Sequence, residues 1–422
     1  MLLPRTQAGN ALPRRPDPGA WLCPGKGVLP SSLRNLPTPS IMHSFVLILL
    51  LAAFPALSTD MYLPAIPALC ELWGISLASA NLSLVAFFAS FSAFLLVHGA
   101  LADRFGRRPV LLAAVSLYVA GSLACAGAGS IAILVLARVV QAIGAAGASA
   151  MALTLAKDLY AGDRRKKLLA YIGVIIPLCP MVAPTIGALM LQHVSWRGIF
   201  LAQALLALPA LYGSFRLQEP AFERAGGGLQ AAAGRYARLF RNRGYLVYAL
   251  AFSVVNFAFF AFIGGSPDIY ITGYGLDEGA FGLYFAFNAL GLMAGSFLCS
   301  RLCVGIESFR ILTASLLGML AASAAMLLLG GATPLRFALP MFAYSLFLGL
   351  SRPISNDMVL EQVDRDTGAA ASLLTFFNFM VGAAAMEAIS LGWTSKSAVI
   401  AVTGLAGNLA PLAALLLLRR RG

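Results

Sequence analysis

Asp60 and Arg138 are charged side chains inside long apolar runs of the sequence, and they are the residues best suited to chemistry. Asp60 comes late in the first run, 43–65, and Arg138 comes early in the run 131–153. A charge at membrane depth is costly, so it usually faces a cavity or a partner and has a function there. Asp60 is suited to binding and releasing a proton, and Arg138 to coupling or substrate binding, with Asp60 as a candidate partner. The alternatives are a position at the outer water interface for Asp60 and a brace between helices for Arg138.

Other polar side chains interrupt the apolar runs and are candidates for lining a cavity. Gln141 follows Arg138 by three residues, so both lie on one face of a helix. The remaining candidates are Tyr62, Asn256, Asn288, Asn378 and Glu387. An Asn inside a membrane helix can also serve only to hydrogen-bond to a neighbouring helix, and the sequence leaves both interpretations open.

The sequence lacks the residue patterns that mark enzymes and metal sites. It contains no GxxxxGK[ST] phosphate loop, no GxSxG elbow and no HExxH helix, which argues against ATP-driven transport and against hydrolysis by this chain. Cys299 and Cys303 share a helix face, but no further ligands accompany them, and a structural zinc site needs four. We therefore predict no enzyme, no cofactor and no metal site.

The elements that must position these residues are membrane-spanning helices. Of the 422 residues, 59% are hydrophobic and 11% are charged, whereas a soluble domain usually carries about 25% charged residues. The apolar runs are about 20 residues long and apolar on every face, which is the length that a helix needs to cross a bilayer. We predict twelve spans: 43–65, 77–98, 109–128, 131–153, 168–191, 198–216, 245–266, 279–300, 310–330, 335–353, 368–392 and 397–418.

Lys and Arg residues gather in every second connection between the spans. With both termini in the cytoplasm, 26 of the 30 basic residues lie on the cytoplasmic side, three lie outside and Arg138 lies within a span. Such a bias follows the positive-inside rule. It predicts a multi-pass protein of a bacterial inner membrane with both termini cytoplasmic. It also explains the net charge of +13 without nucleic acid as a partner.

The largest hydrophilic connection, 217–243, divides the spans into two sets of six. It is rich in Gly, Ala and Arg, as in a flexible link. We therefore predict two six-helix bundles, 42–216 and 244–422, with the substrate path between them. Residues 1–41 are rich in Pro and Arg and have no long apolar run, so they are a disordered cytoplasmic tail, a targeting segment or the product of a start codon assigned too early. Met42, directly before the first span, favours the last interpretation.

Two short motifs are candidates for controlling how the bundles move. The connection 99–109 packs one acid and three Arg into a tight turn, which suggests a cytoplasmic latch; the alternative is a plain basic connector. The residues of this motif are Gly99, Asp103, Arg104, Gly106, Arg107 and Arg108. In the span 168–191, we expect Pro180, Pro184 and Gly187 to form a hinge, because Pro bends a helix and Gly allows close packing.

These motifs resemble those of a known family of transporters. Residues 99–108 resemble the signature between helices 2 and 3 of the major facilitator superfamily. Arg138 with Gly144 resembles the helix 4 motif of its drug-proton antiporters, and 183–187 resembles their helix 5 motif. Residues 58–67 resemble the first helix of the Bcr/CflA multidrug exporters. The resemblance implies an all-α membrane protein with twelve transmembrane helices in two six-helix bundles.

The resemblance also implies roles for the charged residues. Asp60 would be the proton and cation site, and Arg138 would couple its protonation to helix movement. Asp103 with Arg104 and Arg107 would form the cytoplasmic latch.

The function that this resemblance implies is proton-coupled efflux of small organic molecules or drugs by alternating access. Some related exporters carry another acid about two turns before the Asp60 position, where this chain has Ala52 and Ala53, so a preference for cationic drugs does not follow. The alternatives are a transporter of the same fold for a sugar, amino acid or nucleoside, and a non-transporting receptor or scaffold. The expected partners are a small-molecule substrate, protons and the lipid bilayer, and we expect the chain to be a monomer.

Overall fold

The structure of the protein is a computed structural model in which residues 38–219, 228–331 and 333–419 are described. Residues His43–Gly422 form one structural unit. The N-terminal segment 1–41 lies almost wholly outside the described residues. Within them the chain is helical and contains no strand, which confirms the predicted all-α class.

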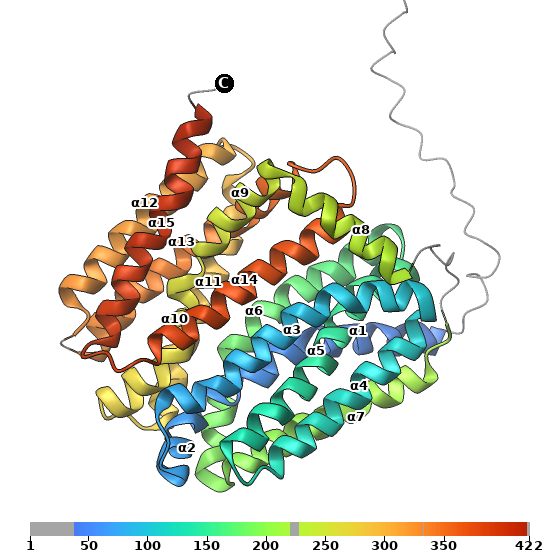
Figure 1. The fold of residues 1–422 in the computed structure, drawn as a ribbon, viewed down its shortest axis with the longest axis horizontal. Helices are drawn as coiled ribbons and strands as arrows, with labels where there is room; N and C mark the ends of the chain where they lie inside the picture. Colours follow the sequence, from blue (N-terminus) through green and yellow to red (C-terminus); the bar gives the residue numbers. More distant parts are fainter. Residues whose placement is uncertain (1–37, 220–227, 332, 420–422) are drawn as a thin grey trace, which may run out of the picture. The chain divides into compact units, whose positions relative to one another are not determined.

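The first six spans follow one another along the chain and are coloured blue to green in Figure 1. Their helices are α1 (Thr38–Asp60), η2 (Leu63–Ala65), α2 (Ile66–Trp73), α3 (Leu77–Phe105), α4 (Arg107–Ala126), α5 (Ile131–Leu159), α6 (Gly162–His193) and α7 (Trp196–Arg216). The first span is broken into α1, η2 and α2 directly after Asp60. Pro64 and Pro67 follow the break, and neither has the backbone N–H that would continue the hydrogen bonding of α1.

The last six spans are coloured yellow to red in Figure 1. Their helices are α9 (Arg243–Val254), α10 (Phe257–Pro267), the π-helical turn η3 (Asp268–Gly273), α11 (Glu278–Leu302), α12 (Ser308–Leu329), α13 (Pro334–Leu360), α14 (Thr367–Ile389) and α15 (Lys396–Arg419). The seventh span is broken near Asn256, between α9 and α10. The first span of each half is therefore interrupted.

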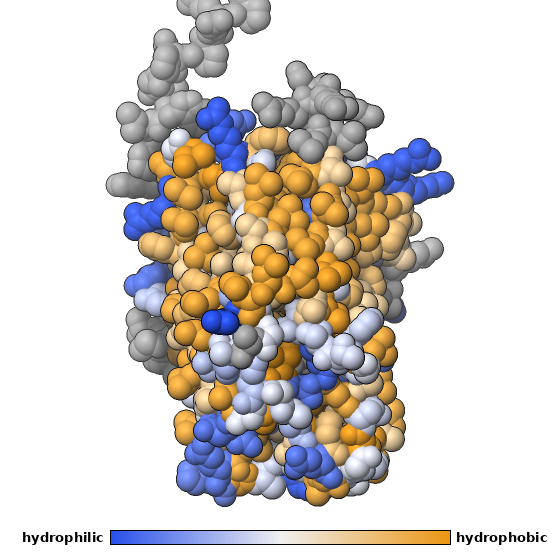
Figure 2. Space-filling model, turned by 90° about the vertical axis from the view of Figure 1, so that its left-hand side faces the viewer, coloured by the Kyte–Doolittle hydropathy of each residue, from blue (hydrophilic) through white to orange (hydrophobic). Residues whose placement is uncertain are grey.

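Twelve helical stretches among the described residues are long and apolar enough to cross a membrane, which confirms the predicted number of spans. Large apolar side chains also lie on the outer surface, where Leu136, Leu283 and Leu328 are 69%, 67% and 83% exposed. Figure 2 shows that apolar residues cover much of one face, whereas hydrophilic residues gather toward its lower end. Such a surface is costly in water and suits contact with lipid.

Successive spans run in opposite directions, so alternate connections meet at the same end of the bundle. Most Lys and Arg residues in the described part of the chain lie in or within a few residues of the connections α3–α4, α5–α6, α11–α12 and α13–α14, or on the connecting helix α8 (Gly228–Arg241), which belongs to the same set. We call this the basic end and the other the opposite end. The two halves pack together mainly through α3 against α14 and through α6 against α11.

The connection 217–243, expected to be a flexible link, contains the helix α8. Ala232 and Leu239 are buried on one side of this helix, while Arg238 and Arg241 are exposed on the other. The hydroxyl of Tyr236 donates a hydrogen bond of 3.1 Å to the carbonyl of Leu96 on α3. This amphipathic pattern explains why the second part of the connection is ordered as a helix.

The tenth span is longer than the sequence predicts. The apolar pattern indicated 335–353, but α13 continues to Leu360. Polar residues such as Asn356 and Asp357 end the apolar run before the helix ends. Arg352 comes at the end of the predicted span and was counted among the cytoplasmic basic residues. In the structure it lies about 12 Å before the end of its helix, at 1.5 Å per residue.

Candidate functional site

Arg138 lies at the centre of a buried polar network in the first half. Its side chain, on α5, is fully buried. Its Nη1 donates hydrogen bonds to the Ser58 carbonyl at 2.9 Å and to Gln141 Oε1 at 2.6 Å. The break after Asp60 explains the first bond, because the Tyr62 N–H bonds to the Thr59 carbonyl instead of to Ser58. The broken helix thus presents a free carbonyl to a buried cation.

Aromatic rings enclose the Arg138 guanidinium on its remaining sides. Its carbon lies 4.3 Å from the ring centre of Phe87, 5.2 Å from that of Tyr62 and 5.8 Å from that of Phe200. Such cation–π contacts compensate part of the cost of removing a cation from water. Its Nε and Nη2 atoms have no hydrogen-bond partner in the described part of the chain.

Gln141, one turn beyond Arg138 on α5, extends this network to other helices. Its Nε2 donates to Ser122 Oγ on α4 and to Gln203 Oε1 on α7, both at 2.8 Å. Gln203 in turn donates to the Leu57 carbonyl of α1 at 3.2 Å. The sequence interpretation missed Gln203, although a Gln inside the apolar run 198–216 is the same kind of signal as Gln141.

Asp60 lies at the end of α1, where the first span breaks. Its side chain is 5% exposed, so it is buried and does not lie at a water interface. Its Oδ1 accepts a hydrogen bond from Thr59 Oγ1 at 3.1 Å. Among the described residues no ion pair joins Asp60 to Arg138, because the guanidinium is bonded to Ser58 and Gln141. Asp60 and Arg138 are therefore connected indirectly: Arg138 bonds to the Ser58 carbonyl, and Thr59 lies between Ser58 and Asp60 on α1.

The hinge motif of α6 packs against the broken part of the first span. Pro184 and Gly187 are buried, and Pro180 lies one turn before Pro184. A Cβ atom at Gly187 would come within 2.0 Å of the Met61 carbonyl oxygen, so only Gly allows this approach. The motif thus places α6 directly beside the residue that follows Asp60.

A second polar centre lies in the second half and lines two adjoining cavities. The residues shared by both cavities are Arg352, Asn356, Leu374 and Asn378. The larger cavity has a volume of about 150 Å³ and is also lined by Phe260 and Phe379. We call it the Arg352 cavity. The sequence interpretation missed Arg352, because its position at the end of an apolar run looked like a basic loop residue.

The structure brings some of the predicted polar residues together and separates others. Asn256 Nδ2 donates to Asn378 Oδ1 at 3.2 Å, and both residues line the smaller cavity. Asn288 instead accepts a hydrogen bond from Ser345 Oγ at 2.8 Å, so it joins α11 to α13 and lines neither cavity. Glu387 lines neither cavity, and its buried Oε2 has no hydrogen-bond partner among the described residues.

Tyr62, the remaining cavity candidate, is fully buried beside Arg138. Its hydroxyl lies 3.0 Å from Ser83 Oγ on α3. It belongs to the polar network of the first half and lines neither of the two cavities.

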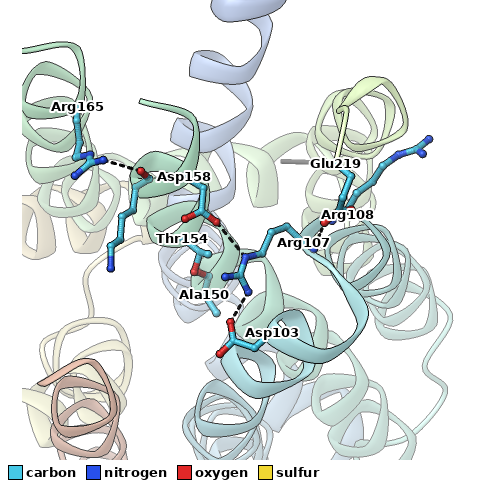
Figure 3. Close-up of polar contacts among 9 residues, drawn as sticks. Asp103, Arg107, Arg108, Ala150, Thr154, Asp158, Arg165 and Glu219 are labelled. Carbon is cyan, nitrogen blue, oxygen red and sulfur yellow. Dashed lines mark hydrogen bonds and ion pairs between the residues drawn. The ribbon is translucent and has the colours of Figure 1, made fainter. Parts of the chain in front are cut away.

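The charged motif after α3 ties helix ends of the first half together at the basic end (Figure 3). Arg107 donates to Asp103 Oδ1 at 2.6 Å and to Asp158 Oδ2, at the end of α5, at 3.1 Å. Glu219 accepts the backbone N–H groups of Arg107 at 2.5 Å and of Arg108 at 3.0 Å. A carboxylate is favourable at this N-terminus of α4 because the helix dipole is positive there.

Two residues of this motif differ in position from the expected latch. Gly99 lies inside α3, so the turn is made at Gly106 alone, which has a φ of 103°. The Arg104 guanidinium lies over the ring of Phe105 at 5.1 Å and has no ion pair in the described residues. Asp158 of α5 and Glu219, at the start of the connection 217–243, are partners of this motif that the sequence interpretation missed.

Contacts between the halves close the opposite end. Asn81 of α3 is fully buried, and its Nδ2 donates to the Gly264 carbonyl at 2.9 Å and to Ser390 Oγ at 2.7 Å. Farther along α3, the ring of Phe88 stacks on Phe379 of α14 at 5.3 Å. At the basic end, Arg238 of the connecting helix α8 forms an ion pair of 2.7 Å with Asp366 of the second half.

Comparisons with known proteins identify chains of the same architecture. The chain is 27% identical over 373 residues to an uncharacterized MFS-type transporter of Bacillus subtilis (strain 168), with 86% of this chain and 92% of that protein covered. It is also 27% identical over 346 residues to a bicyclomycin resistance protein homolog of Haemophilus influenzae, with 80% and 87% covered. The fold is similar to that of a D-xylose-proton symporter, with a TM-score of 0.71 at 14% identity and 87% and 96% of the two chains covered.

The sequence profile described as Major Facilitator Superfamily matches residues 48–386. Together with the fold, this match confirms the predicted major facilitator fold and a transporter rather than an enzyme. The resistance protein among the relatives agrees with the resemblance to drug exporters that the motifs indicated. The chain therefore belongs to the Major Facilitator Superfamily.

Proposed function

We propose that the protein exports small organic molecules across a bacterial inner membrane in exchange for protons, by alternating access between its two six-helix halves. Membership of the superfamily supports transport, and a relative named for bicyclomycin resistance supports a drug-like substrate. We place the basic end and both termini in the cytoplasm, following the positive-inside rule. We expect the monomer to be the working unit.

The observation that carries proton coupling is a buried carboxyl at the break of a membrane helix. Asp60 ends α1, and two residues earlier the Ser58 carbonyl accepts a hydrogen bond from Arg138. A proton on Asp60 removes a negative charge close to this contact, so the electrostatic balance between α1 and α5 changes. Because Gly187 packs on Met61, the same change also reaches α6.

These contacts support the following transport cycle. A proton that enters from the outside neutralises Asp60, the two halves rock, and the proton leaves on the cytoplasmic side as substrate is captured. Asn81, whose bonds to Gly264 and Ser390 close the opposite end, must release them when the protein opens outward. In this structure the halves are therefore joined where the outside gate would lie.

Substitution of Asp60→Asn tests this proposal, because Asn has the same shape but cannot bind the proton. In inverted membrane vesicles that contain the wild-type protein, addition of bicyclomycin or another drug substrate is expected to release protons, measured with a pH-sensitive dye. The Asp60→Asn variant should show no such release while it still inserts and purifies as a folded protein.

Asp163→Asn is the matched control, since Asp163 is a highly exposed acid that forms an ion pair with Lys166 on the same helix. It should behave as the wild type does. Unimpaired proton release by Asp60→Asn would refute the coupling role of Asp60. Absence of proton movement in the wild type with every drug of a broad panel would refute proton-coupled drug export itself.

A further inference from the structure

Arg352 is a cation within a membrane span that the protein leaves without a counter-ion. It lies on α13 and lines both cavities of the second half. Its backbone carbonyl accepts a hydrogen bond from Ser355, but its guanidinium has no hydrogen bond or ion pair with any described residue. By contrast, Arg138 is bonded to a carbonyl and a Gln, and Arg107 to two acids. A charge at this depth is costly and is normally paired.

The walls around Arg352 favour an anion as the missing partner. The described residues that line the two cavities include no Asp and no Glu, so a bound anion would meet no like charge. Asn356 and Asn378 supply neutral polar groups beside the guanidinium. Asn378 uses its Oδ1 to accept from Asn256, which leaves its Nδ2 as a donor. An Arg fork with nearby amide N–H groups is a typical receptor for a carboxylate or sulfonate.

The size and the apolar wall of the Arg352 cavity limit the rest of the ligand. Phe260, Phe379 and Leu360 face the same cavity as the guanidinium. Its volume of about 150 Å³ is similar to that of a cavity that holds a single benzene ring. The site therefore suits one ring, or an apolar group of equal size, that carries one anionic group.

The aromatic wall also belongs to the contact between the two halves. The ring of Phe379 stacks on Phe88 of α3 at 5.3 Å and lies edge-on to Phe91 at 5.2 Å. A ligand that packs on Phe379 therefore touches the second half at the surface where it meets the first. Rocking of the halves would change the shape of this wall.

We propose that the Arg352 cavity binds a small organic anion, with its carboxylate or sulfonate on Arg352 and its apolar body on Phe260 and Phe379. Such anions are then the substrates that are exported, a statement that rests on the proposed function. The absence of an acid at Ala52 and Ala53, before Asp60, agrees with an anionic rather than a cationic cargo. The export of an anion and the entry of a proton both move positive charge inward, so the cycle is electrogenic.

Equilibrium binding to the purified full-length protein in detergent tests the site without transport. The probes are benzenesulfonate, the neutral benzenesulfonamide and the cation benzyltrimethylammonium, which share a ring and differ in charge. We expect the wild type to bind benzenesulfonate most tightly of the three. Arg352→Gln should weaken benzenesulfonate binding at least about tenfold, the loss of one charge-assisted hydrogen bond, and leave benzenesulfonamide binding unchanged.

Two further variants keep the result interpretable. Arg352→Lys retains the charge and should keep part of the affinity for benzenesulfonate, which shows that the site tolerates substitution. Arg336→Gln, which removes an exposed Arg at the other end of the same helix, should bind as the wild type does. Equal binding of anion and cation by the wild type, or equal anion binding by Arg352→Gln, would overturn the proposal.

The outcome for Arg352 is separable from that for proton coupling. Asp60→Asn should still bind benzenesulfonate in detergent, because Asp60 does not line the Arg352 cavity. If proton release survives in Asp60→Asn while anion binding depends on Arg352, the coupling mechanism fails and the anion site stands. If Asp60 controls proton release but Arg352→Gln changes only transport and not anion affinity, Arg352 serves helix movement and the anion site fails.

Discussion

The two halves of the molecule each place an arginine at membrane depth, but they treat it in opposite ways. Arg138 is fully buried, bonded to Ser58 and Gln141 and surrounded by three aromatic rings. Arg352 lines a cavity, and its guanidinium has no hydrogen bond or ion pair among the described residues. The difference teaches that residue type alone does not assign a role. A cation that is bonded to neighbouring helices holds them together, whereas one whose guanidinium has no bonded partner is available to a ligand.

The two halves also differ in where they place acidic residues. The first half contains the buried Asp60 at a helix break, whereas the cavities of the second half have no carboxylate in their walls. The proposed proton site and the proposed anion site thus lie in different halves. Proton and substrate therefore need not compete for one residue, and the two halves pack together through α3 against α14 and through α6 against α11.

The largest expected effect comes from removing Arg138, the arginine that is bonded to neighbouring helices. Arg138→Met fills the aromatic enclosure but removes the donor of Gln141 Oε1 and leaves the Ser58 carbonyl with only the 3.5 Å hydrogen bond from Gln203 Nε2. Two hydrogen bonds from a charged donor, each worth about 1.5–3 kcal/mol, correspond to a loss of transport of at least about 100-fold. We expect this loss for neutral, anionic and cationic substrates alike, measured as uptake into inverted vesicles.

Arg352→Met is the contrasting variant for this test. It should reduce the transport of anions and leave that of neutral molecules within a factor of about two, since it removes no internal hydrogen bond. If both variants lower transport of all substrates equally, the proposed difference between the bonded Arg138 and the unpaired Arg352 is wrong.

An intermediate effect is expected for Gln203, the residue that joins Gln141 to α1. Gln203→Leu removes three neutral hydrogen bonds, to Gln141, Leu57 and Ser58. Each is worth about 0.5–1.5 kcal/mol, so transport should fall at least about tenfold and the melting temperature in detergent should decrease. Ser214→Ala on the same helix removes only a bond to its own helix, to Ala210, and should change neither. Wild-type transport by Gln203→Leu would show that the network ends at Gln141.

The sequence allowed prediction of the helical fold and of the centre of the first half, because a charge within an apolar run stands out. Asp60 and Arg138 could be singled out in this way. Gln203 and Asn81 carry no charge, and their importance depends on which helices meet, which a single sequence does not show. Arg352 was missed for a different reason: it lies at the end of the predicted span 335–353 and was counted with the cytoplasmic basic residues, whereas α13 continues to Leu360.

The smallest expected effect comes from substituting one arginine at the basic end of each half, Arg107 or Arg301. Arg107 bridges Asp103 and Asp158, whereas the second half has only a faint echo of this motif, Gly295 and Arg301. The Arg301 guanidinium lies over the ring of Phe297 at 5.3 Å and has no ion pair among the described residues. Arg107→Gln should lower transport about threefold, in keeping with about 0.2–1 kcal/mol for a partly exposed ion pair. Arg301→Gln should leave the rate unchanged, so equal rates for the two variants would show that the bridge of the first half does not control movement.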